Sequence, residues 1–289
     1  MNQNTFKFSV LTILSLLIVS CNNNETTNNI VSNASENKNQ SEAKGEGTLN
    51  LVANGEDFVR EGFVTKDGWN MSFDRLDVNV GKVTAYQIDG ALNPESTDTT
   101  DGLNEQAKVS LVNTPTVIDL AEGEADAEPI LVTDSKVTAG FYNAIAWNME
   151  TAGAESPLAG KTIVMQGTAT KDNRVINFDI SLNRPVGYLC GEFVGDDRKG
   201  MVEADSTGEI ETTFHFDHVF GDGESDPDEY INVNALGFEP LAQLASGNDL
   251  TIDDETLTQK LSPEDQEKLT NAIISLGHVG EGHCKVTNW

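Results

Sequence analysis

Basic residues are scarce in this chain. Its 289 residues include 18 lysines and arginines but 47 aspartates and glutamates, for a formal net charge of −29 at pH 7. Nucleic acids and anionic lipid surfaces bind proteins that offer a basic footprint to their phosphates. The composition therefore argues against both as direct partners. An acidic surface of this strength instead repels anions and raises the local concentration of cations.

Histidine and cysteine are also rare, with four and three residues respectively. The sequence has no HExxH, GxSxG, Walker or CxxC motif and no GxGxxG that opens a helix. No recognised catalytic motif is left, so the sequence does not predict an enzyme. Apolar residues nevertheless make up 38% of the chain, which is enough to bury a core and excludes a wholly disordered protein.

One apolar run lies near the N-terminus, between Phe8 and Val19, and follows the single cation Lys7. A basic start followed by a short apolar segment is typical of a secretory signal peptide. The run ends in Ile18-Val19-Ser20-Cys21, which resembles the lipobox of bacterial lipoproteins. This resemblance implies that residues 1–20 are a signal peptide and that Cys21 becomes the diacylated N-terminus. An ordinary signal peptide with an incidental cysteine is the alternative.

Residues 21–47 are rich in asparagine, serine, glutamate and lysine and offer almost nothing to bury. This composition cannot offset the entropy of ordering, so we expect a flexible tether before a folded domain of residues 48–289. The lipoprotein resemblance implies a cell-envelope protein, anchored to a membrane by lipid and facing away from the cytoplasm. Asn22 resembles the sorting signal for the outer membrane in enteric-type lipoproteins, which implies that membrane in a diderm organism.

Apolar residues of the domain alternate with period two more often than with period 3.6. Alternation over residues 49–53, 71–80 and 176–182 predicts strands, as do the short segments 83–86 and 163–165. The sequence therefore predicts a mainly β protein, an antiparallel β-sandwich with a small helical C-terminal subdomain from about residue 235. The segment TAGFYNAI (residues 138–145) resembles a strand start of secreted prealbumin-like sandwiches over eight residues, which implies the same fold class.

One helix near the C-terminus has clear signals. Ser262 fits an N-cap, a proline and two acids follow it, and apolar residues from Leu269 to Leu276 have helical spacing. We expect Gly277 to end this helix. A second short helix is expected over residues 235–244. Residues 90–106 have no periodic apolar face and are expected to form a surface loop.

All four histidines lie in two short windows, residues 215–218 and 278–283. Neutral imidazole is a common ligand of zinc and copper, and metal motifs often space their ligands three to five residues apart. On a continuous strand His215 and His218 would point to opposite faces, so they converge only if the strand ends or bulges near Asp217. Glycines at positions 277, 280 and 282 let the second window wrap around an ion.

Because the two windows hold every histidine of the chain, we expect them to form one site. Its proposed ligands for a zinc or copper ion are His215, His218, His278 and His283. Asp217 is expected to be a fifth ligand, or an acceptor that orients an imidazole. The alternative is that these histidines are packed or hydrogen-bonded residues without a metal.

Two cysteines remain after removal of the signal peptide, Cys190 and Cys284. In an exported domain such a pair most often forms a disulfide, which here would close a loop of about 95 residues. The alternative is that Cys284, beside His283, is a thiolate ligand, which would favour Cu(I) or zinc.

An acidic loop follows the first histidine window. Its alternating acids Asp222, Glu224, Asp226 and Asp228 could hold calcium, but the EF-hand order and its closing glutamate are missing. We therefore expect a solvated acidic loop that concentrates cations near the site.

Three functions fit these features. The first is a lipid-anchored envelope protein that captures, stores or delivers zinc or copper. The second is a structural or partner-binding envelope lipoprotein without a metal. The third is a metallohydrolase, which an open coordination position would allow. No particular protein partner is predicted.

Replacing Cys21 with alanine should leave the protein without lipid, either released from the membrane or retained unprocessed, because the diacyl group is attached to this sulfur. Lipid labelling and membrane fractionation measure the effect. Normal labelling of Cys21→Ala would contradict the lipoprotein interpretation.

Overall fold

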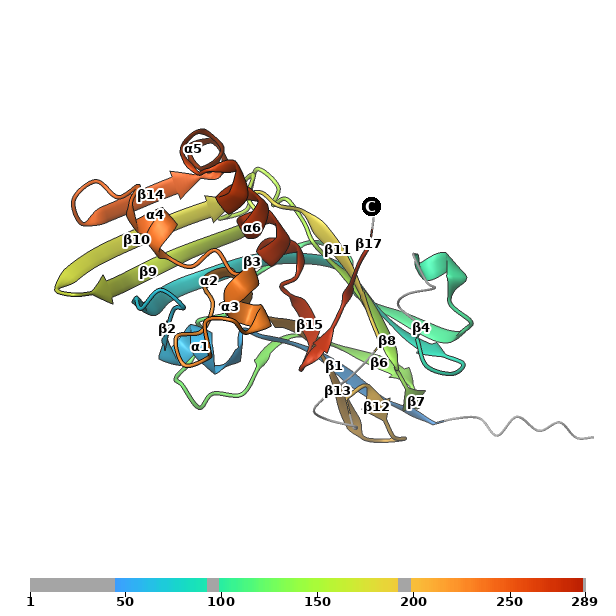
Figure 1. The fold of residues 1–289 in the computed structure, drawn as a ribbon. Helices are drawn as coiled ribbons and strands as arrows, with labels where there is room; N and C mark the ends of the chain where they lie inside the picture. Colours follow the sequence, from blue (N-terminus) through green and yellow to red (C-terminus); the bar gives the residue numbers. More distant parts are fainter. Residues whose placement is uncertain (1–44, 93–98, 192–198, 288–289) are drawn as a thin grey trace, which may run out of the picture. The chain divides into compact units, whose positions relative to one another are not determined.

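The computed structural model describes residues 45–92, 99–191 and 199–287, which fold into large curled sheets with few helices (Figure 1). The mainly β, sandwich-like fold predicted from the alternating pattern is confirmed. The expected signal peptide, Cys21 and nearly all of the expected tether lie outside the described residues. No helix in the described part of the chain is long and apolar enough to cross a membrane.

The larger sheet is organised around one long strand, β3 (Asn70–Ile88). The sequence predicts two strands here, but the structure has one with a shift in register between Gly81 and Thr84, where Lys82 has a φ of +52°. The other strands of this sheet are β2 (Phe63–Val64), β4 (Glu105–Val112), β5 (Thr116–Asp119), β8 (Ala144–Met149), β9 (Ile163–Lys171), β10 (Arg174–Leu182), β11 (Val186–Cys190), β14 (Asp249–Asp253) and β17 (Lys285–Thr287). Since β3 pairs with β2, β4, β5, β8 and β9, it is the central strand of this sheet.

The smaller sheet has the strand order β16-β15-β13-β1-β6. Its strands are β1 (Glu46–Asn54), β6 (Ile130–Thr138), β13 (Thr207–Phe214), β15 (Gly277–Val279) and β16 (Gly282–His283), and a separate pair joins β7 (Gly140–Phe141) to β12 (Met201–Val202). β1 begins two residues before the domain start expected at residue 48. Trp147 on β8 contacts Phe214 on β13 with ring centroids 5.0 Å apart, so the two sheets share one hydrophobic core.

Two strand pairs depart from the antiparallel pattern of the sandwich. β1 is parallel to β13, and β10 is parallel to β14. Parallel neighbours need a long connection, and a large part of the chain separates the members of each pair. Residues 171–174 form a tight antiparallel hairpin between β9 and β10. Asp172 and Asn173 have φ values of +49° and +67°, as a two-residue hairpin turn requires.

The helices are short, and they are α1 (Glu56–Glu61), α2 (Asp217–Phe220), α3 (Tyr230–Asn234), α4 (Glu239–Ala242), α5 (Asp254–Lys260) and α6 (Pro263–Ile274), with a 3₁₀ turn at Thr100–Gly102. α6 begins as predicted, because the hydroxyl of Ser262 accepts the backbone N–H of Asp265 at 3.1 Å. α6 ends at Ile274 and not at Gly277. Gly277 lies in β15, where a Cβ atom would come within 2.5 Å of the Tyr188 ring, so this glycine serves close packing.

Two other expectations need correction. The helix expected over residues 235–244 is reduced to the four residues of α4, and Gly237 before it has a φ of +82° that no helix accommodates. The loop expected over residues 90–106 is shorter, because β4 already begins at Glu105. Residues 93–98 of that loop lie outside the described part of the chain.

The structure contains the disulfide that the two remaining cysteines predict. Cys190 on β11 is bonded to Cys284, with their Cα atoms 4.4 Å apart and a sequence separation of 94. Cys284 is therefore not a free thiolate ligand. The bond joins the segment that carries His283 to the larger sheet.

The double variant Cys190→Ala/Cys284→Ala should lower the free energy of unfolding by roughly 2–5 kcal/mol, because the unfolded chain is then free of a long closed loop. Urea denaturation followed by tryptophan fluorescence measures this change. Reductant should destabilise the wild type and leave the double variant unaffected. Equal midpoints for the variant and the oxidised wild type would contradict the stabilising role.

Candidate metal centre

The end of β13 brings the first histidine window into a tight turn. β13 stops at Phe214, so His215 lies just beyond the strand, and the single turn of α2 then begins at Asp217. The backbone N–H of His218 contacts the carbonyl oxygen of His215 at 3.2 Å, which closes the turn. Because the strand ends here, His215 and His218 can lie on the same side, which the alternation of a continuous strand would prevent.

The second window lies beside the first because β15 pairs with β13. In this antiparallel pair His278 is opposite Thr213, and β16 then places His283 opposite His278. Residues directly opposite each other in a β pair project from the same face of the sheet. The imidazoles of His278 and His283 are thus neighbours, with ring centroids 4.2 Å apart.

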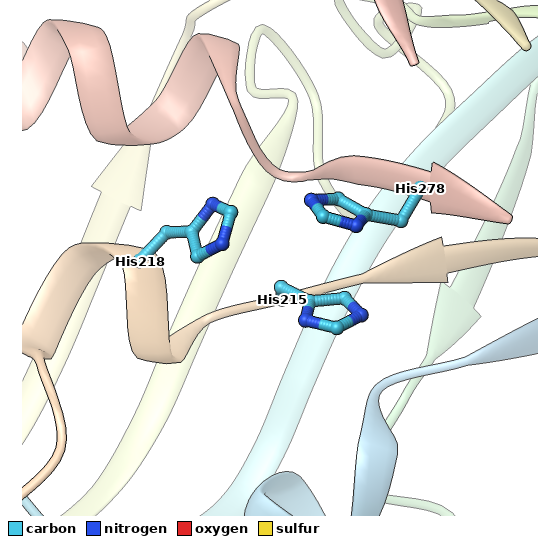
Figure 2. Close-up of side chains that lie close together, drawn as sticks. All are labelled: His215, His218 and His278. Atoms are coloured by element: carbon cyan, nitrogen blue, oxygen red, sulfur yellow. The ribbon is translucent and has the colours of Figure 1, made fainter. Parts of the chain in front are cut away.

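Three of the four imidazoles form a compact group. The potential ligand nitrogens of His215, His218 and His278 all lie within 4.8 Å of one another. Figure 2 shows the three side chains gathered between the end of β13, α2 and the strand β15. Tetrahedral coordination with bonds of 2.0–2.1 Å separates ligand nitrogens by about 3.3 Å, so small side-chain rotations would bring the three onto one ion.

His278 is the most buried member of the group. Its residue is 2% exposed, and among the described residues neither ring nitrogen has a hydrogen-bond partner of normal geometry; the same is true of Nε2 of His215, which is 7% exposed. Each buried polar atom without a partner costs about 1–3 kcal/mol. Burial first, and then the other three histidines, lower the pKa of His278 to about 2. The ring is therefore neutral at pH 7 and keeps a lone pair available to a metal.

His218 is held in one orientation by Ser275. Its Nδ1 lies 3.1 Å from both the carbonyl oxygen and the hydroxyl of Ser275, and a carbonyl oxygen can only accept, so Nδ1 carries the hydrogen. Nε2 is then the nitrogen with the free lone pair. Burial lowers the pKa of His218, and the nearby carboxylate of Asp217 partly opposes that effect.

Asp217 lies between the two histidines of its window. Its Oδ1 accepts the backbone N–H of His218 at 3.0 Å and is 3.9 Å from Nδ1 of His215. This position suits an acceptor that orients His215 better than a fifth ligand.

The carboxylate of Glu56, a residue that the sequence did not single out, lies on the other side of His215. Its Oε1 is 3.7 Å from Nε2 of His215, and burial raises its pKa. Glu56 also has a φ of +61°, an unfavourable conformation for a residue other than glycine. No sequence signal indicates this role, because α1 has six residues and the contact joins positions 159 residues apart.

A second missed carboxylate, Glu211, supports the turn of the second window. Its Oε1 accepts hydrogen bonds from Nζ of Lys199 at 2.5 Å, from Oγ1 of Thr213 at 2.7 Å and from the backbone N–H of Gly280 at 2.8 Å. Glu211 is buried, and a buried carboxylate with three donors is well satisfied. It ties the β15–β16 turn to β13.

The acidic loop at residues 222–229 is held together by its own hydrogen bonds. The carboxylate of Asp222 accepts the N–H of Glu224 and the hydroxyl of Ser225, while the amide of Asn232 donates to the carbonyl oxygens of residues 222, 225 and 226. These are oxygens that a calcium ion would need. Within the described residues Asp222, Glu224, Asp226 and Asp228 do not converge as a metal-ligand group, whereas the three histidines do.

Comparison of the chain with family models, curated proteins and solved structures gives no match. The likeness of residues 138–145 to prealbumin-like sandwiches therefore stays a prediction. The geometry of the site is that of a metal centre: three clustered imidazoles, two of them buried, with carboxylates on two sides can bind a transition metal and orient its ligands.

Acid should destabilise the metal-free protein through His278. Unfolded histidine has a pKa near 6.5, while the folded state holds this group at about 2, so between these values only the unfolded chain takes up the proton. Stability should therefore fall as pH drops below about 6.5, by up to about 1.4 kcal/mol per pH unit for this proton.

Urea denaturation in the presence of a chelator, repeated from pH 7.5 to 4.5, measures this slope. His278→Leu should flatten it, because the group that takes up the proton on unfolding is then absent. An unaltered slope in His278→Leu would show that other groups cause the acid sensitivity.

Proposed function

We propose that this protein binds one zinc or copper ion at His215, His218 and His278, and that it captures, stores or delivers this ion at the cell envelope. The observation that carries the proposal is the imidazole of His278, which is buried with both nitrogens unpartnered and lies against two other histidines. A bound metal ion would accept the lone pair of such a nitrogen and so replace the missing hydrogen bond.

A purely structural role explains this arrangement less well. A packed histidine normally hydrogen-bonds its neighbours, as His218 does with Ser275, and an apolar side chain would fill the place of His278 without leaving polar atoms unpaired. Protonation does not relieve the cost, because the burial that lowers the pKa of His278 also disfavours a positive charge there. The cluster therefore favours a bound cation over packing.

Carboxylates around the cluster support the same function. Glu56 and Asp217 lie within 4 Å of the two nitrogens of His215, one on each side. Carboxylates in such positions orient a metal-bound imidazole and increase its basicity, and their loss typically weakens metal binding 10–100-fold. The strongly acidic chain also attracts cations toward the site.

The proposed location follows from the lipobox at Cys21. A diacylated Cys21 and a tether up to residue 47 would hold the domain at a membrane surface outside the cytoplasm. In that compartment the disulfide between Cys190 and Cys284 is stable. The domain would there meet extracytoplasmic zinc or copper.

Titration of the purified chain, without a polyhistidine tag, with Zn²⁺ and Cu²⁺ tests the proposal. The wild type should bind one equivalent, and His215→Ala and His278→Ala should weaken binding by more than about 100-fold, because losing a direct ligand costs at least as much as losing an orienting carboxylate. Circular dichroism checks that both variants fold.

Asp226→Asn is the matched control, since it removes one acidic charge from the neighbouring loop and no ligand. Its affinity should equal that of the wild type at physiological salt, where screening weakens the field of an exposed charge. Equal affinities for the wild type and both histidine variants would reject the metal site and leave the structural lipoprotein. A loss in His215→Ala alone would restrict the site to the first window.

A further inference from the structure

A metal held by His215, His218 and His278 needs a route between the site and the solvent. His215 and His278 are buried, and Glu56 and β15 cover the cluster from two sides. His218 is only partly buried, so it is the most accessible of the three proposed ligands. A buried metal site without an access route would load only during folding.

A cavity of about 370 Å³ lies beside the cluster and supplies such a route. His218 and His283 line it together with Ser275, Asn271, Asn234 and Tyr230. Its rim is open to solvent, since Tyr230 is 80% exposed and His283 is exposed as well. Among the described residues that line this cavity there is no lysine or arginine whose charge would repel a cation.

His283 differs from the other three histidines in its exposure to solvent and in its position outside their cluster. It is exposed and lies outside the group whose nitrogens converge within 4.8 Å. Its ring is nevertheless 4.2 Å from that of His278 and 5.8 Å from that of His218, measured between centroids. It therefore lies between solvent and two of the proposed ligands.

The surrounding backbone permits His283 to move relative to the cluster. β16 has only two residues and is the edge strand of its sheet, and Gly280 and Gly282 precede His283 in the turn. Gly280 has a φ of +53°, and its N–H is fixed by Glu211. The disulfide at Cys284 limits how far the segment can swing. The side chain of His283 can therefore rotate while the backbone on either side of it stays in place.

We propose that His283 is the exchange ligand of the metal centre, an inference that rests on the proposed function. Its imidazole replaces one water of a hydrated ion at the mouth of the cavity and holds the ion next to His278 and His218. His278 and His218 then each replace a further water of the ion. His283 dissociates from the ion when His215 binds as the third ligand. Release of the ion follows the same steps in reverse, without any transfer of protons or electrons.

The test compares rates with equilibrium affinity. Stopped-flow mixing with Zn²⁺ measures uptake, and transfer of bound Zn²⁺ to a chromophoric chelator measures release. His283→Ala should slow both by about tenfold, the factor that corresponds to about 1.4 kcal/mol in each barrier. Its equilibrium affinity should change by less than about threefold, since a group that lowers the barrier in both directions leaves the end states unaltered.

Asn234→Ala is the matched control, because Asn234 is an exposed residue of the same cavity that offers no imidazole. Its rates and affinity should equal those of the wild type. Unchanged rates in His283→Ala would overturn the exchange role, with metal binding itself intact. A fall in affinity as large as that of His278→Ala would also overturn it and make His283 a permanent fourth ligand. A wild type that binds no Zn²⁺ would instead reject the proposed function.

Discussion

Backbone pairing on both edges of β13 is the constraint on which the region of the histidines depends. Along one edge β13 pairs in parallel with β1. Along the other edge its last two residues pair antiparallel with β15. This arrangement joins the first strand of the domain to its C-terminal segment. Glu56 follows β1, His215 follows β13 and His278 belongs to β15, so three strands deliver the groups of the cluster. A slip of one residue in either pairing would turn these side chains to opposite faces.

The sequence could predict the main features of this site, because they depend on local patterns. Alternating apolar residues indicate the strands whichever neighbours they pair with, and Ser262 indicates the start of α6 through a hydrogen bond three residues away. The histidine windows stand out because the chain has no other histidines. The sequence also stated the condition for His215 and His218 to converge, that the strand ends or bulges near Asp217, and β13 does end at Phe214.

What the sequence could not predict depends on contacts between distant residues. Glu56 is one of many acids, and only the path of β1 and α1 brings it to His215. The partners of Glu211 come from residues 199, 213 and 280, which no local pattern connects. Gly277 resembles a helix terminator, yet the ring of Tyr188 decides its place in β15. α5 was missed although Asp253 caps it by accepting the N–H of Thr256, a signal that the sequence does contain.

The parallel pairing of β1 with β13 also orders the assembly of the domain in time. Thr48 is paired with Thr207, and chains are synthesised at about 5–20 residues per second, so β1 exists for on the order of ten seconds before its partner does. β6 precedes β13 in the chain, so the partner of one edge of β1 is synthesised well before the partner of the other. β15 and β16 are added last of all in this sheet. A nascent chain therefore has no histidine cluster, and an ion can be loaded only onto a nearly complete polypeptide.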